Sequence, residues 1–127
     1  MYKEARNVAD EFSRICREVP NSVKFYEEEI SICDKALCDV RHYAELNKTN
    51  RAMNGKLVKA LREYSKRRRT ASDNLCVLKP LGEFIKANGV VLNKLDQVRG
   101  EMRKEALYVD GNRNYKPRVL EALFEGR

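Results

Sequence analysis

The residues best suited to bind a ligand lie near the C-terminus, in the block of residues 112–118. This block combines three cations, two amides and one aromatic ring in a turn that precedes a helix start. Arg113 and Arg118 each offer a fork of N–H donors that matches two phosphate oxygens. Tyr115 adds a face for stacking, and Pro117 suits a first helical turn, where free N–H groups favour an anion. The block therefore predicts a nucleotide-phosphate site, with a solvated connector as the alternative.

An aromatic ring and two amides surround the short apolar run of residues 90–92. Phe84 offers a ring on which a base can stack, and Asn88 or Asn93 offers a side-chain amide that can read a base edge. Packing in the core is an equally good interpretation of Phe84. Phe84 with either amide is thus a candidate contact to an adenine base.

The excess of positive charge is concentrated in residues 51–70. The chain has a formal charge of +7, and this stretch holds eight basic residues against Glu63 alone. Such a stretch predicts a surface that attracts phosphates. The run Lys66-Arg67-Arg68-Arg69 has two interpretations: its arginines bind an anion, or they pair with the triplet Glu27-Glu28-Glu29 across a helix hairpin.

No group of residues has the pattern of a catalytic, metal or cofactor site. The chain lacks a glycine-rich phosphate loop, and its single histidine, His42, has no local nucleophile pattern. The four cysteines form no Cys-x-x-Cys pair of the kind a zinc site uses, and nothing indicates an oxidising compartment. We therefore expect reduced cysteines packed as small hydrophobes, no enzymatic activity, and no metal or cofactor.

Apolar residues at spacings of three and four predict the helices that must position these groups. Pro20 is expected to end a helix, Pro80 to kink or end one, and Gly89 to stop one. The expected helices cover residues 2–18, 22–46, 51–79, 81–88 and 93–107, with a final helix from Pro117. An Asp-Gly turn between two short strands is expected within residues 107–116, with coil as the alternative.

Two of these helices carry matching apolar seams. The seams of residues 23–44 and 57–78 stay in register when the chain folds at the polar loop 47–50, so that Cys33 faces Tyr64. A short loop between long helices favours antiparallel neighbours. We expect a single, mainly α domain over residues 1–127. It comprises a long antiparallel helical hairpin over about 22–79, short flanking helices, and a ligand-binding part over about 80–127 with a small β-hairpin.

The order of these parts resembles the phage-encoded Thoeris anti-defence proteins that act as signal sponges. The shared parts are the Arg-rich sequence of the hairpin (Tyr64-Ser65-Lys66-Arg67-Arg68-Arg69), the Pro-Leu-x-x-Phe segment Pro80 to Phe84, and the closing Arg-x-Tyr-x-Pro-Arg-Val-Leu-x-x-Leu-Phe from Arg113 to Phe124. The resemblance spans roughly residues 36–126, and the closing motif is its most specific part.

The resemblance implies a role without catalysis. Proteins of that family bind the cyclic ADP-ribose isomers made by bacterial TIR-domain defence enzymes and hold them uncleaved, and some also hold cyclic oligonucleotides. It further implies a homo-oligomer, a dimer or higher, in the cytoplasm of the infected bacterium. By position, Phe84 would stack on the base, Asn93 would contact it, and Arg113 and Arg118 would hold the phosphates. Tyr115 belongs to the motif without an assigned role.

Composition leaves two alternatives to signal sequestration. No apolar run approaches the ~20 residues of a membrane span, and the N-terminus is not signal-like, so we expect a cytoplasmic protein without a membrane partner. A basic helical nucleic-acid-binding protein would lose affinity steeply with salt. A structural coiled-coil assembly protein would bind no small ligand, and Arg113 and Arg118 would be dispensable.

Overall fold

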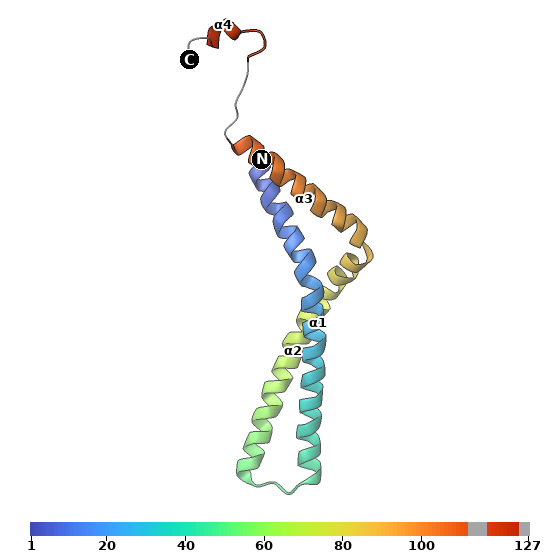
Figure 1. The fold of residues 1–127 in the computed structure, drawn as a ribbon. Helices are drawn as coiled ribbons and strands as arrows, with labels where there is room; N and C mark the ends of the chain where they lie inside the picture. The colour runs from blue at the N-terminus through green and yellow to red at the C-terminus, as the bar shows by residue number, and fades with distance from the viewer. Residues whose placement is uncertain (112–116, 125–127) are drawn as a thin grey trace.

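The computed structural model describes residues 1–111 and 117–124 of the chain. Within these residues the protein is mainly α-helical, as predicted, and contains no strand. The helices are α1 (Tyr2–Leu46), α2 (Arg51–Ala87), α3 (Gly89–Asp110) and the short α4 (Glu121–Phe124). α1 and α2 run side by side in opposite directions in the lower part of Figure 1, and α3 returns towards the start of α1.

α1 is one continuous helix of 45 residues, whereas the sequence predicted separate helices over 2–18 and 22–46. Pro20 lies inside it, where the missing N–H and the ring clash cost ~3 kcal/mol or more. The apolar repeat nevertheless continues in phase across the proline, from Val19 to Val23. Because one apolar face runs through both halves, burial against α2 and α3 offsets the local cost of Pro20.

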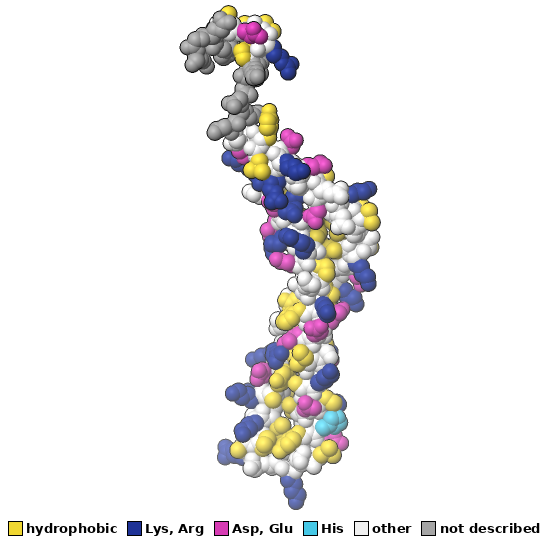
Figure 2. Space-filling model, viewed as in Figure 1, with side chains coloured by type: hydrophobic (Ala, Val, Ile, Leu, Met, Phe, Trp, Pro, Cys, Tyr) yellow, Lys and Arg dark blue, Asp and Glu magenta, His cyan; other side chains and the backbone are white. Residues whose placement is uncertain are grey.

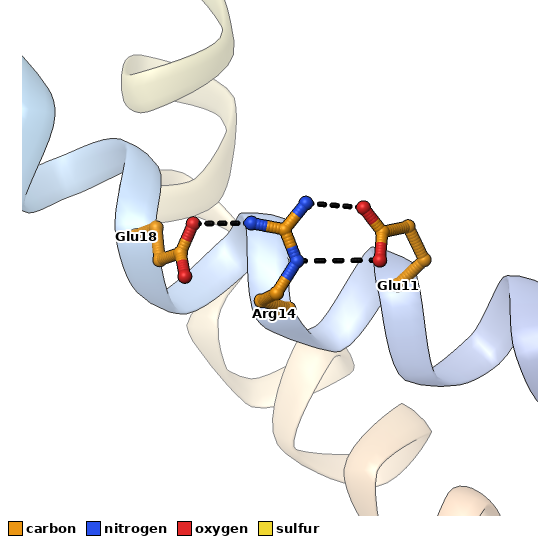
Figure 3. A network of polar contacts seen from close by, with 3 residues as sticks. All are labelled: Glu11, Arg14 and Glu18. Atoms are coloured by element: carbon orange, nitrogen blue, oxygen red, sulfur yellow. Dashed lines mark hydrogen bonds and ion pairs between the residues drawn. The ribbon is translucent and has the colours of Figure 1, made fainter.

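Side-chain ion pairs bridge the turns of α1 just before Pro20 (Figure 3). Arg14 donates to both carboxylate oxygens of Glu11 and, through Nη1, to Glu18 Oε2 at 2.5 Å. The hydrogen bonds from Arg14 lower the pKa of the Glu11 carboxyl group. All three side chains are about half exposed, so solvent screens these pairs and their stabilisation of α1 is modest.

The predicted helix end at Pro80 is also wrong, whereas a helix does end directly before Gly89, as predicted. α2 continues through Pro80 to Ala87 and joins the two helices expected over 51–79 and 81–88. The break falls at Asn88, whose backbone N–H and side-chain Nδ2 donate to Phe84 O at 3.0 and 2.9 Å. Gly89 begins α3, which therefore includes residues 90–92 and exceeds the expected helix 93–107 at both ends.

The hairpin half consists of residues 23–46 of α1 and 51–79 of α2, joined by the loop 47–50. Asn50 caps α2, because its Oδ1 accepts a hydrogen bond from Met53 N at 2.8 Å. Cys33 of α1 is fully buried and Ala71 of α2 is 2% exposed. The burial of these small side chains shows that α1 and α2 pack against each other at both positions.

Two ion pairs join the helices of the hairpin half. Arg67 Nη2 lies 2.6 Å from Glu29 Oε1, and Arg68 Nε lies 2.5 Å from Asp34 Oδ1. The hydrogen bond to Glu29 raises the pKa of the Arg67 guanidinium group. Two arginines of the basic run thus have partners within the chain, one from the expected acidic triplet and one from the following turn of α1.

α1 and α2 cross at Val19, Val23 and Gly82, a contact that we call the crossing. A Cβ atom on Gly82 would lie 3.2 Å from Val23 Cγ2, closer than ordinary van der Waals contact. Glycine therefore permits the close approach of the two helices here. Pro20 and Pro80 lie within two residues of the crossing, where tertiary contacts hold both interrupted helices in place.

The open half lies beyond the crossing and consists of residues 2–18 of α1 together with α3. Tyr2 Oη donates to Asp110 Oδ1 at 2.6 Å, and Ser13 Oγ donates to Asp96 Oδ1 at 2.5 Å. These pairs show that α1 and α3 run in opposite directions. The hydrogen bond to Asp110 raises the pKa of the Tyr2 hydroxyl group.

The C-terminal expectations are corrected in part. Residues 108–110 continue α3, so the strand expected to begin there is helical. The remainder of the predicted β-hairpin, residues 112–116, lies outside the described residues. The final helix begins at Glu121 rather than at Pro117, and residues 117–120 are not helical.

The elongated chain exposes much apolar surface. Its solvent-accessible area is 10881 Å², whereas a compact monomer of 14.8 kDa exposes about 7,000 Å². Exposed apolar side chains occur on both halves and include Val8, Phe25, Leu46 and Val77. Within the described residues, none of the helices combines the length and the apolar character that crossing a bilayer requires.

Candidate functional site

The structure describes three of the five predicted ligand contacts. Phe84 lies near the end of α2, and 52% of its surface is exposed. Asn93 is exposed in the second turn of α3, and Arg118 is exposed in the segment before α4. Arg113 and Tyr115 lie outside the described residues.

The junction between α2 and α3 separates the two amides considered as base contacts. Asn88 uses its side chain to cap α2, because Nδ2 donates to Phe84 O. Asn93 has no such capping role and lines a hollow of about 150 Å³ between α1 and α3. Phe84 does not line this hollow, whereas its buried neighbour Ile85 does. The structure thus leaves Asn93 available to a ligand and gives Asn88 a structural role.

A polar cluster that the sequence analysis missed stands beside this hollow; it consists of Asp10, Ser13, Asp96 and Arg99. Ser13 is buried and donates to Asp96 Oδ1. Arg99 Nη1 donates to Asp10 Oδ1 at 3.2 Å, and Arg99 Nε lies 3.4 Å from Asp96 Oδ1. That last pair is an ion pair without hydrogen-bond geometry, so the buried Nε atom has no hydrogen-bond partner. The cluster fixes α3 on α1 through charged groups.

Cys16 of α1 also lines this hollow. Burial raises the pKa of the Cys16 thiol, and the negative charge of Asp96 raises it further. The thiol is therefore protonated and poorly nucleophilic near neutral pH. Cys33, Cys38 and Cys76 are likewise free thiols, and no group of metal-ligating side chains forms within the described residues.

Two further hollows lie along the open half and share Arg6. The cationic hollow, about 250 Å³, is lined by Arg6, Asp10, Arg99, Gly100 and Arg103. The apolar groove, about 430 Å³, lies between the start of α1 and the second half of α3. Its walls are mainly Tyr2, Val98, Met102, Ala106 and Val109.

The spacing of charged residues along each helix gave a sequence signal for the cationic hollow. Arg99 and Arg103 lie four residues apart and therefore on one face of α3, as do Arg6 and Asp10 on α1. What the sequence did not supply was the pairing of these two faces. α1 and α3 are far apart in the chain and are not joined by a short loop that would have indicated their contact.

The basic stretch of α2 presents a second cationic surface, seen at the lower end of the molecule in Figure 2. Its exposed cations are Arg51, Lys56, Lys59, Arg62, Lys66, Arg68 and Arg69. Arg67 is partly buried and stacks over Tyr64, with its guanidinium carbon 5.1 Å from the ring centroid. At one end of this surface Lys66 and Arg67 line a hollow of about 300 Å³, whose other lining residues are Phe25, Tyr26, Glu29, Thr70 and Ala71.

Comparison with known proteins adds no family to these observations: no protein-family model, curated protein or solved structure matches the chain.

Proposed function

We propose that this chain is a phage anti-defence protein that binds a cyclic nucleotide immune signal, a cyclic ADP-ribose isomer, and holds it uncleaved. The observation that carries the proposal is the exposure of Phe84, Asn93 and Arg118. These residues supply a stacking ring, a base-reading amide and a phosphate-binding guanidinium group. Arg118 belongs to the closing motif from Arg113 to Phe124, by which the sequence resembles the sponge proteins.

Self-association is part of the proposal. The helical hairpin would act as the scaffold of a dimer or higher homo-oligomer, in which a second copy closes the site. The support is the excess of exposed surface and, on α1, the apolar side chains Val8, Phe12 and Ile15, which line an open hollow of about 500 Å³. Burial of such side chains in an interface would stabilise both the assembly and the ligand site.

Binding without cleavage is the feature that separates the proposal from an enzyme. Nanomolar binding requires about −12 kcal/mol, which arginine–phosphate forks and base stacking in a closed pocket can supply. The net charge of +7 would accelerate capture of an anionic signal. Such a protein would act in the cytoplasm of an infected bacterium, where the signal is made.

The test is calorimetric titration with cyclic ADP-ribose isomers, followed by chromatography of the released ligand. We expect tight binding and recovery of the intact ligand. Phe84→Ala and Arg118→Gln should each weaken binding by about tenfold or more, which corresponds to about 1.4 kcal/mol. Lys48→Gln, which removes a charge in the hairpin loop, is the matched control. Recovery of a cleaved product, or equal loss in the control, would contradict the proposal.

Nucleic-acid binding is the alternative that a specific observation favours, namely the exposed cations of α2. It predicts that affinity for DNA or RNA falls steeply as salt is raised. Replacing Lys56, Lys59 and Arg62 together by glutamine should reduce the salt slope. Binding of the cyclic nucleotide should remain unchanged in the same triple variant if the main proposal is correct.

A further inference from the structure

The cationic hollow lies where the contact between α1 and α3 brings like charges together. Arg6 and Asp10 of α1 line it together with Arg99, Gly100 and Arg103 of α3. Three guanidinium groups therefore share the hollow with a single carboxylate among its lining residues. Like charges held across a helix contact repel each other and weaken that contact. An anion in the hollow would remove this repulsion.

The carboxylates closest to the hollow are already engaged by Arg99. Asp10 Oδ1 accepts from Arg99 Nη1 at 3.2 Å, and Asp96 Oδ1 lies 3.4 Å from Arg99 Nε. Neither Arg6 nor Arg103 forms an ion pair within the described residues. Two guanidinium groups that line the hollow, one from each helix, are thus available to an external anion.

Gly100 keeps space open in the cationic hollow. A Cβ atom at this position would meet no neighbour within 4 Å. A glycine inside a helix is destabilising relative to alanine, so helix stability does not account for the residue. Its contribution to the hollow is the room that a larger side chain would fill.

The size and charge of the hollow favour a small oxyanion. Its volume of about 250 Å³ lies below the roughly 300–1,000 Å³ typical of sites for drug-sized molecules, so the hollow suits an ion or a single anionic group. A phosphate dianion offers oxygen pairs that match two guanidinium forks and compensates two positive charges. A carboxylate offers one oxygen pair and one negative charge.

We propose that the cationic hollow binds a phosphate group between Arg6 of α1 and Arg103 of α3, and that this bridge fastens α3 on α1. The site goes beyond the proposed function, because none of its residues belongs to the ligand-binding set that contains Phe84, Asn93 and Arg118. Each copy of the chain contains the whole site, whereas the proposed function relies on a second copy.

The experiment is a titration of the isotope-labelled full chain with sodium phosphate, followed by nuclear magnetic resonance. Sodium chloride keeps the ionic strength constant, and a slightly alkaline pH favours the dianion. We expect saturable shifts of the amide signals of Arg6 and of residues 99–103. Sodium acetate should give no saturable shift. Shifts confined to the basic stretch of α2, or equal shifts with acetate, would overturn the proposal.

The first variant removes one of the two available guanidinium groups. Arg103→Gln should weaken phosphate binding about fivefold or more, because it deletes one fork at an exposed position without an ion pair. Lys104→Gln is the matched control, since it removes the same charge from a neighbour that does not line the hollow. Solvent screens that exposed charge, so affinity should change less than about twofold. Unchanged binding in Arg103→Gln would overturn the proposal.

The second variant fills the hollow without changing its charge. Gly100→Leu should abolish detectable phosphate binding, while the higher helix propensity of leucine favours the folded protein. Gly55→Leu, at a glycine of α2 with equally open surroundings, is the control and should bind as the original chain does. Retained binding in Gly100→Leu would contradict the assignment of the ion to this hollow.

Glycerol 3-phosphate distinguishes a free phosphate ion from the phosphate group of a larger molecule. Tighter binding than inorganic phosphate would assign the site to a phosphate monoester, and weaker binding would assign it to the free ion; both results support a phosphate site. Arg118→Gln should leave phosphate binding unchanged, whatever it does to the cyclic nucleotide. Loss of phosphate binding in Arg118→Gln, with retention in Arg103→Gln, would overturn the proposal.

Hydrogen exchange tests the bridge between the helices. Phosphate should slow exchange in α3 and in residues 2–18 of α1, because a ligand that binds only the closed contact stabilises it. Exchange around Cys33 in the hairpin half should stay the same. Unchanged exchange in the open half of a phosphate-saturated sample would show that the ion does not fasten α3 on α1.

Discussion

The two halves of the molecule use the same helix, α1, in opposite ways. In the hairpin half, small buried residues such as Cys33 and Ala71 bring α1 and α2 together, and the ion pairs of Arg67 and Arg68 lie beside this contact. In the open half, the polar cluster around Arg99 joins α1 to α3, and hollows remain between the helices. The two halves thus differ in what joins their helices: buried small side chains in the hairpin half, and hydrogen-bonded polar and charged groups in the open half.

The largest expected effect on stability comes from a charge placed in the buried contact between α1 and α2. Ala71→Glu would bury a carboxylate at a position that is 2% exposed, while Arg67, which lines the same hollow, is already paired with Glu29. We expect the free energy of unfolding to fall by about 3–5 kcal/mol, measured by urea denaturation followed by circular dichroism. Ala52→Glu, an exposed position of the same helix, should change it by less than about 0.5 kcal/mol. A small effect at Ala71 would contradict the tight packing of the hairpin half.

A smaller effect is expected when the polar cluster is broken. Asp96→Ala leaves the buried Ser13 hydroxyl without its acceptor and deprives Arg99 of one carboxylate. We expect a loss of about 1–3 kcal/mol. Hydrogen exchange should show faster exchange along α3, while the protection of the hairpin half around Cys33 stays unchanged. Uniform loss of protection in both halves would show that they unfold as one unit.

Two glycines of α2 should respond with opposite signs. Gly55→Ala should raise the free energy of unfolding by up to about 1 kcal/mol, because a Cβ there meets nothing and alanine favours the helix. Gly82→Ala gains the same propensity but places its Cβ 3.2 Å from Val23 Cγ2 at the crossing. We expect the steric conflict to prevail and the variant to be less stable. Equal stabilisation by both changes, measured by urea denaturation, would contradict the close crossing.

The smallest expected effect concerns the thiols. Cys16 lines a hollow of the open half with a raised pKa, whereas Cys76 is exposed on α2. Because alkylation requires the thiolate, a raised pKa leaves less reactive sulfur at pH 8. Iodoacetamide should therefore modify Cys76 before Cys16, as peptide mass spectrometry can measure. In Asp96→Ala the reaction at Cys16 should accelerate, since that variant removes a negative charge and loosens α3.

The sequence predicted the helical class and the boundaries at the loop 47–50 and before Gly89, but not the continuity of the helices through the two prolines. Pro20 and Pro80 predicted helix ends, and local propensity alone would have produced them. The structure follows the apolar repeat instead, which runs through Val19 and Val23 without a change of phase. An apolar seam that continues in register therefore outweighs an isolated helix breaker. Burial along the whole apolar face stabilises the helix more than the loss of one hydrogen bond destabilises it.

The contacts between α1 and α3 in the open half could not be predicted, for a different reason. Its contacts join residues separated by more than eighty positions, such as Ser13 with Asp96 and Arg99 with Asp10. A chain segment of that length can return by many routes, and no seam of α3 matches α1 as clearly as the seams of the hairpin match each other. Phe84 and Asn93 could be proposed as ligand contacts because their chemistry is visible in the sequence, whereas the cationic hollow depends on tertiary pairing.

The uninterrupted α1 makes the protein a lever with its pivot near Pro20. From Pro20 to Leu46 the helix rises about 39 Å, so a bend of about 10° at the proline would displace the hairpin loop by about 7 Å. Any closure of α3 on the start of α1 would thus be transmitted, enlarged, to the opposite tip of the molecule. A pair of fluorophores, one at the open half and one at the hairpin loop, would report binding between α1 and α3 as a change in the distance between them.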